Sequence, residues 1–103
     1  MKFNKLIRDK IIENWNPKYG KNPKAHTASE AEFYNKLKEK LLEETQEFIR
    51  DDSPNEIADI MELINTICDF KGFSKDEIDT LRRKKISRNG AFKKKLILES
   101  SEH

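Results

Sequence analysis

The chain has 103 residues, a length typical of one domain, so we expect a single domain over residues 1–103. Its hydrophobic fraction is 35% and its charged fraction is 39%, against usual values of about 45 to 50% and about 25%, which excludes a large core. The single cysteine excludes an intramolecular disulfide, and the opening MKFNKLIRDK lacks the apolar run of a signal peptide or membrane span. We therefore expect a cytoplasmic protein without a membrane partner, and one whose small core favours a second subunit or a bound ion.

The first predicted elements are a short helix and a loop. Spaced apolar residues suggest a short basic helix over residues 4–14. Residues 15–27, WNPKYGKNPKAHT, contain two prolines and one glycine without an apolar period, which predicts a loop. Within it, Trp15 either anchors the loop or stacks on a base. We interpret His26 and Cys68 as ordinary surface and core residues.

Three serines, each followed three residues later by a glutamate, mark the starts of three helices. In such a capping box, the Ser oxygen and the Glu carboxylate bind backbone N–H groups that a helix start leaves open. The pairs are Ser29 with Glu32, Ser53 with Glu56, and Ser74 with Glu77. Glycines end the second and third of these helices. The predicted helices cover residues 30–51, 54–71 and 75–88, and the tail 92–98 is expected to be extended.

Each of the first two of these helices has one acid inside its apolar stripe and a second acid three residues later. At about 100° per residue, Glu44 falls among the core-facing positions of the first helix and Glu47 at their edge. Glu56 and Asp59 repeat this arrangement in the second helix. The connection over residues 51–53 is short enough to make the helices antiparallel neighbours. At about 1.5 Å per residue, all four carboxylates lie within about 10 Å of the connection and share one level.

These four carboxylates predict a metal site. An ionised carboxylate in an apolar seam is unfavourable without a cation, and like charges at close range raise each other's pKa. All-oxygen ligands favour Mg²⁺, with Mn²⁺ as the alternative. The sequence lacks the cluster of His or Cys residues that would indicate Zn²⁺. Structural explanations compete with this interpretation. Glu56 is also the third residue of a capping box, and Glu44 could reach solvent or pair with Lys40.

The net charge of +2 conceals a segregation of charge along the chain. Residues 1–24 carry seven Lys and Arg against two acids, residues 25–79 carry six against fifteen, and residues 80–103 carry eight against two. Solvated helix faces can produce this pattern, and cations late in a helix also favour its macrodipole. The alternative is an acidic site for a cation, with basic ends that receive the anion bound to it. The candidate phosphate contacts are Arg8, Lys10, Lys84, Lys85 and Arg88.

The acidic residues also carry a family resemblance. The pattern E-E-x-x-E followed by E-x-x-D, here Glu43, Glu44, Glu47, Glu56 and Asp59, resembles the metal-binding signature of the all-α nucleoside triphosphate pyrophosphohydrolases, the MazG-like and phosphoribosyl-ATP pyrophosphohydrolase-like group. The opening KLIRDKI and the closing KK-x-x-R-N-G-A-F with its basic tail are similar to the flanking motifs of a small, single-domain branch of that group. The resemblance covers nearly the whole chain outside the predicted loop.

The resemblance implies an all-α helical bundle, built on the antiparallel helix pair and completed by assembly into a homodimer or homotetramer. It implies Mg²⁺-dependent hydrolysis of a nucleoside triphosphate or related nucleotide between the α and β phosphates, giving a nucleoside monophosphate and pyrophosphate. Glu44, Glu47, Glu56 and Asp59 would be the metal ligands. Glu43 would assist a second ion or orient the water, and Glu47 or Glu43 is the candidate base for the proton of the water.

A second hypothesis is a non-catalytic helical dimer that binds nucleotides or nucleic acid through its basic ends. The acids of residues 25–79 would repel a phosphate backbone, and no nucleic-acid motif is present. The acid pair in each apolar stripe favours the enzyme, because a binding module has no use for it.

Overall fold

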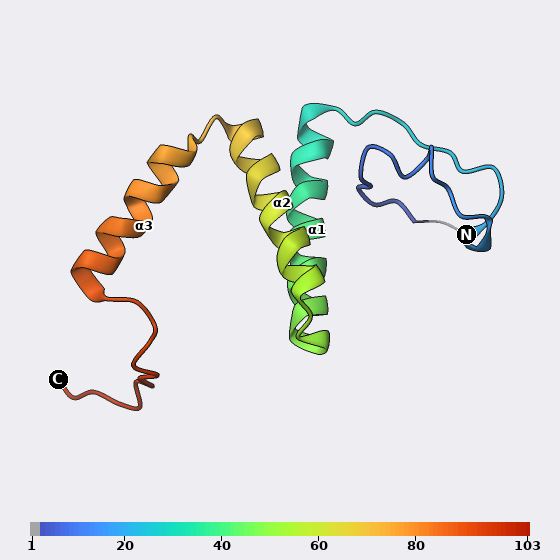
Figure 1. Ribbon diagram of the computed structural model, residues 1–103. Coiled ribbons are helices and arrows are strands. Elements are labelled where there is room, and N and C mark those ends of the chain that lie inside the picture. The colour runs from blue at the N-terminus through green and yellow to red at the C-terminus, as the bar shows by residue number, and fades with distance from the viewer. Residues whose placement is uncertain (1–2) are drawn as a thin grey trace. The chain divides into compact units, whose positions relative to one another are not determined.

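The computed structural model describes residues 3–103, which form α-helices, turns and irregular segments without any strand (Figure 1). This confirms the predicted all-α class, and the helix bounds agree with the prediction to within one residue. The elements are a 3-10 helix η1 (Pro17–Tyr19), α1 (Glu30–Asp51), α2 (Pro54–Lys71) and α3 (Lys75–Asn89).

Serine side chains cap the starts of α1 and α3 as predicted. Ser29 Oγ accepts a hydrogen bond from the Glu32 backbone N–H at 3.2 Å, and Ser74 Oγ accepts one from Glu77 N–H at 3.0 Å. At the start of α2, Ser53 Oγ instead accepts from the Asn55 N–H, at 3.2 Å. The hydrogen bonds among residues 3–103 thus include neither bond of the capping box predicted for α2, because its serine binds the N–H group one residue before Glu56.

Helices α1 and α2 form an antiparallel contacting pair, as the short connection predicted (Figure 1). The chain reverses at Asp52, whose left-handed backbone (φ 50°) lets its N–H donate to Phe48 O at 2.8 Å. At the other end of the pair, Phe33 meets Phe70 edge to face with ring centroids 5.4 Å apart. Leu37, with 0% exposure, is the only buried hydrophobic residue in the described part of the chain. The core is therefore as small as the composition predicted.

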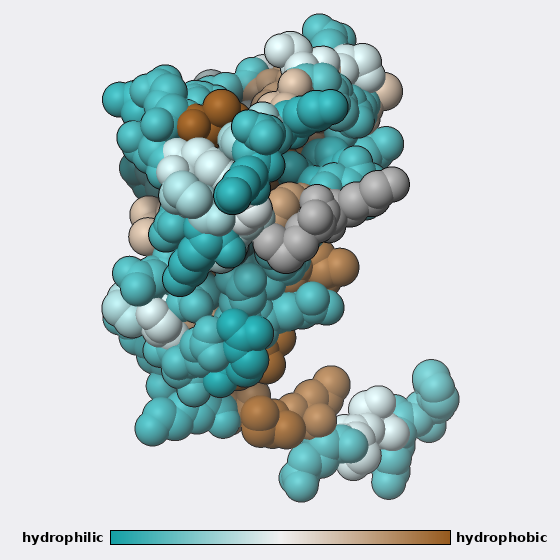
Figure 2. All heavy atoms as spheres, turned by 90° about the vertical axis from the view of Figure 1, so that its right-hand side faces the viewer, coloured by the Kyte–Doolittle hydropathy of each residue, from teal (hydrophilic) through white to brown (hydrophobic). Residues whose placement is uncertain are grey.

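Hydrophobic side chains remain exposed on both helices of this pair. Met61 on α2 is 61% exposed and Ile49 on α1 is 72% exposed. The face drawn in Figure 2 is mostly hydrophilic, with hydrophobic side chains in separate patches. None of the helices within residues 3–103 is long and apolar enough to cross a membrane. We call the exposed apolar residues of the pair the open face: Leu42, Ile49, Ile57, Met61 and Ile64.

The chain from Gly72 onward is a compact unit separate from the residues up to Lys71. It contains α3, which ends where Gly90 donates its N–H to Ile86 O at 2.8 Å. The tail has a turn at residues 93–94 and is otherwise irregular, so the expected extended conformation does not become a strand. Phe92 and residues 96–98 are exposed.

The predicted short helix over residues 4–14 was wrong. The segment forms successive turns, in which Ile11 N–H donates to Arg8 O at 3.1 Å and Asn14 N–H donates to Lys10 O at 3.0 Å. Helix nucleation is unfavourable, and an isolated helix shorter than about 12 to 15 residues is marginal. This segment is below that length, so contacts with α1 and α2 decide its conformation.

Candidate metal centre

Glu44 lies in the interior side of α1, where the periodicity of the sequence placed it. Its side chain is 7% exposed, and Oε2 is buried without a hydrogen-bond partner among residues 3–103. Burial rules out the solvent-reaching alternative. Lys40 lowers the pKa of Glu44 only as the smallest of several influences, and no ion pair within residues 3–103 joins the two. A buried carboxylate oxygen without a partner is costly, which indicates that a ligand or proton belongs there.

The environment of Glu44 raises its pKa from 4.5 to about 7. Burial is the largest cause, because it disfavours the charged carboxylate. The neighbouring carboxyl groups of Glu47 and Asp59 add to it. Two of the proposed ligands, one from each helix, therefore act on the carboxyl group of Glu44.

Glu56 occupies the matching place near the start of α2. Its Oε2 is also buried and has no hydrogen-bond partner in the described part of the chain. Because Ser53 caps the Asn55 N–H, the serine contact of a capping box does not account for the position of Glu56. Its neighbour Asp51 has a lowered pKa, caused mainly by the hydrogen bonds that the Arg50 guanidinium donates to it. Two unpaired buried oxygens, one from each helix, thus lie at the two positions that the apolar stripes predicted.

The N-terminal segment supplies cations to the remaining acids. Arg8 Nη2 donates a hydrogen bond to Asp59 Oδ1 at 2.6 Å, and Lys5 Nζ lies 3.5 Å from Glu43 Oε1. Arg8 was predicted to bind phosphate, and here it binds a predicted metal ligand. Lys5 was not among the predicted site residues, although it opens the same KLIRDKI motif. The basic charge of that motif is the feature of the sequence that could have predicted a contact between Lys5 and the acidic helix pair.

The donor set fits a hard divalent cation, but its side chains do not converge in this structure. No group of three His, Cys, Asp or Glu side chains within residues 3–103 is arranged so that it could hold a metal ion. Metal binding would therefore require side-chain rotations within the cluster. The two unpaired buried oxygens and the all-oxygen chemistry support the fit, because such oxygens are what Mg²⁺ and Mn²⁺ bind. Glu44, Glu47, Glu56 and Asp59 are the residues that would hold the ion.

The other predicted phosphate contacts are exposed. Lys10 lies in the turns of the N-terminal segment. On α3, Arg82 pairs with Asp79 at 3.1 Å and Arg83 pairs with the same carboxylate. None of the ion pairs within residues 3–103 involves the three other cations predicted to bind phosphate, which are Lys84, Lys85 and Arg88.

The residues of uncertain role in the loop now have structural explanations. Trp15 Nε1 donates a hydrogen bond to Gly20 O at 2.9 Å, and its ring meets Phe3 and Tyr19 edge to face. Trp15 is therefore a loop anchor. His26 is exposed and lies 2.9 Å from a Glu32 carboxylate oxygen, and Cys68 is half-buried with a free thiol.

Comparison of the chain with protein-family models, curated proteins and solved structures gives no match. The resemblance to the pyrophosphohydrolases therefore rests on the motifs quoted above.

Proposed function

We propose that this chain is a Mg²⁺-dependent nucleotide pyrophosphohydrolase of the MazG-like type. The observation that carries the proposal is the pair of buried, unpaired oxygens, Glu44 Oε2 and Glu56 Oε2, contributed by two neighbouring helices. A stable small core would bury apolar groups at these positions, because an unpaired carboxylate oxygen costs free energy there. A cation bound by both carboxylates explains why acids occupy positions 44 and 56.

The chemistry of phosphoanhydride hydrolysis matches these residues. A bound Mg²⁺ neutralises charge on the phosphate oxygens and lowers the pKa of a bound water. Glu44, Glu47, Glu56 and Asp59 are the proposed ligands. Glu47 or Glu43 is the proposed acceptor of the proton from the attacking water, since each lies on α1 beside Glu44.

Basic side chains would bind the polyphosphate of the substrate. Arg8 already lies at the acidic cluster, and Lys10 follows it in the same segment. Lys84, Lys85 and Arg88 on α3 are the other proposed contacts, since they are exposed and the ion pairs within residues 3–103 do not use them. Arg and Lys donate charge-assisted hydrogen bonds to phosphate oxygens. This role explains why basic segments come before and after the acidic residues in the sequence.

Assembly into a homodimer or homotetramer is part of the proposal. One buried hydrophobic residue within residues 3–103 is a small core for a chain of this length. The open face offers Met61 and Ile57 at one helical turn on α2, with Leu42 and Ile49 two turns apart on α1. An isologous contact between two copies of the open face would remove this apolar surface from water and complete a bundle.

The test is product analysis with a panel of nucleoside triphosphates and Mg²⁺. Wild-type protein is expected to release nucleoside monophosphate and pyrophosphate, and Glu44→Gln is expected to lose at least a hundredfold in rate. Glu62→Gln is the matched control, because Glu62 is an exposed acid of α2. If no triphosphate or phosphoribosyl nucleotide is cleaved, the non-catalytic helical dimer becomes the better description.

A further inference from the structure

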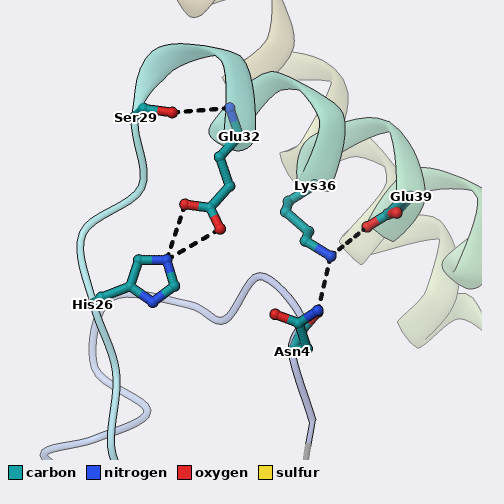
Figure 3. A network of polar contacts seen from close by, with 6 residues as sticks. All are labelled: Asn4, His26, Ser29, Glu32, Lys36 and Glu39. Carbon is teal, nitrogen blue, oxygen red and sulfur yellow. Dashed lines mark hydrogen bonds and ion pairs between the residues drawn. The ribbon is translucent and has the colours of Figure 1, made fainter.

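The N-terminal segment is attached to the α1–α2 pair by cationic and backbone contacts. Lys36 of α1 donates a hydrogen bond from Nζ to Asn4 O at 3.0 Å and also pairs with Glu39 at 3.0 Å (Figure 3). Further along the segment, Lys5 reaches Glu43, and Arg8 reaches Asp59. These contacts place a guanidinium on a proposed metal ligand, although the two residues are 51 positions apart in sequence.

The Arg8–Asp59 contact gives one of the proposed ligands a cationic partner from the N-terminal segment. The Arg8 guanidinium, 2.6 Å from Asp59 Oδ1, offsets the negative charge of that carboxylate and occupies one lone pair of Oδ1. A divalent cation seeks the same charge and the same oxygens. Both cations also reduce the repulsion between Asp59 and Glu44, which contributes to the raised pKa of Glu44. Arg8 and a metal ion are therefore alternative partners of Asp59.

We propose that Asp59 exchanges Arg8 for the divalent cation, and that this exchange releases Arg8 to bind the phosphates of the nucleotide. The inference rests on the proposed function and goes beyond it, because it assigns one arginine two successive partners. Metal loading and phosphate binding are then coupled through residues 4–14. Without metal, the segment satisfies the acidic cluster with its own cation. With metal, the guanidinium is available for an anion at the same place.

The exposure of Arg8 and Asp59 sets how strongly Arg8 competes with a metal ion for Asp59. The Arg8 side chain is 61% exposed and the Asp59 side chain is 38% exposed, and ion pairs at such sites are weak. Removing Arg8 is therefore expected to tighten metal binding by about two- to fivefold. The same change is expected to weaken nucleotide binding in the presence of metal, because a phosphate contact is lost. Opposite effects on the two ligands are the signature of an exchange.

The experiment is calorimetric titration of the full chain with Mn²⁺, followed by titration of the Mn²⁺-loaded protein with a nucleoside triphosphate that has a methylene bridge between its α and β phosphates. Arg8→Gln is expected to bind Mn²⁺ two- to fivefold more tightly than wild type and to bind the analogue at least threefold more weakly. Arg8→Lys is expected to fall between them. Lys21→Gln, which removes one exposed cation from the loop, is the control for net charge.

A second readout follows the segment itself. The Asn14 amide, which donates to Lys10 O, is expected to exchange its hydrogen faster when Mg²⁺ is added to wild type, because the segment loses its Arg8 contact. Equal Mn²⁺ affinity in wild type, Arg8→Gln and Lys21→Gln would contradict the proposed exchange of Arg8 for metal. It would not contradict the metal site itself. Weaker Mn²⁺ binding by Arg8→Gln would also overturn the exchange. Absence of Mn²⁺ binding in every variant would overturn both this inference and the proposed function.

Discussion

Glu47 lies three residues from Glu44 on the same side of α1, and its carboxyl group raises the pKa of Glu44. Burial is the largest cause, and the negative charge of the neighbouring Glu47 adds to it, so that the pKa of Glu44 rises to about 7. In metal-free protein at pH 6, Glu44 is therefore mostly protonated. A divalent cation would replace that proton, which couples metal binding to pH.

The raised pKa predicts how stability depends on pH without metal. Between pH 4.5 and about 7, the folded protein holds the Glu44 proton more tightly than the unfolded chain does. The contribution of Glu44 to the free energy of unfolding is thus fully present below pH 4.5 and is lost as pH rises through 7. Gln resembles protonated Glu, so Glu44→Gln is expected to gain about 1 to 2 kcal/mol relative to wild type between pH 4.5 and 8.

Urea unfolding of both proteins with a chelator, at several pH values, measures this difference. Comparison with Glu44→Gln cancels the contributions of the other acids. A difference between the two proteins that does not change with pH would contradict the raised pKa.

Leu37 is predicted to be the residue on which the helix pair depends most. It is fully buried, and Leu37→Ala is expected to lower the free energy of unfolding by about 2 to 5 kcal/mol. Leu96→Ala removes the same atoms from an exposed place in the tail and is expected to cost less than about 0.5 kcal/mol. Equal effects of the two substitutions in chemical denaturation would show that α1 and α2 do not pack around Leu37.

The open face is predicted to hold two copies of the chain together. A lysine in place of Met61 puts a charge among the residues of that face, so Met61→Lys is expected to convert a dimer or tetramer into monomers. Light scattering coupled to size-exclusion chromatography measures the mass. Leu96→Lys, in the exposed tail, is expected to leave the mass unchanged. A wild-type protein that is already monomeric at micromolar concentration would refute the assembly.

The cations of α3 that form no ion pair within residues 3–103 are predicted to bind phosphate. The combined substitution of Lys84, Lys85 and Arg88 by Gln is expected to raise the KM for a nucleoside triphosphate at least tenfold. Arg82→Gln is the control, because Arg82 pairs with Asp79 within its own helix. Steady-state kinetics at constant ionic strength measures both. If Arg82→Gln raises KM as strongly, general charge rather than a specific contact accounts for the effect.

The helices of this protein could be predicted from sequence because their signals are local. The serine caps, the helix-ending glycines and the apolar periods each act within a few residues, and α1, α2 and α3 begin and end where these signals place them. The buried place of Glu44 was predictable for the same reason, since periodicity alone sets the face of a helix.

Contacts between distant residues could not be predicted in this way. The failed helix at residues 4–14 illustrates it, because the segment takes its conformation from Lys36 and from the pairing of Arg8 with Asp59. The sequence pattern also could not predict that Ser53 Oγ accepts from the Asn55 N–H and not from the Glu56 N–H. Both hydrogen bonds are compatible with the same sequence. Side-chain rotamers in the carboxylate cluster depend on these contacts, so the pattern predicted which acids gather there and not how they point.

The central claim, that acids of α1 and α2 hold one divalent cation, is tested most directly by electron paramagnetic resonance of Mn²⁺ titrated into the protein. Wild type is expected to bind at least one Mn²⁺ per chain and to release it when excess Mg²⁺ is added. Glu44→Gln and Glu56→Gln are each expected to weaken binding at least tenfold, whereas Glu62→Gln is expected to bind as wild type does. Mn²⁺ binding that is absent, or equal in all four proteins, would contradict the site.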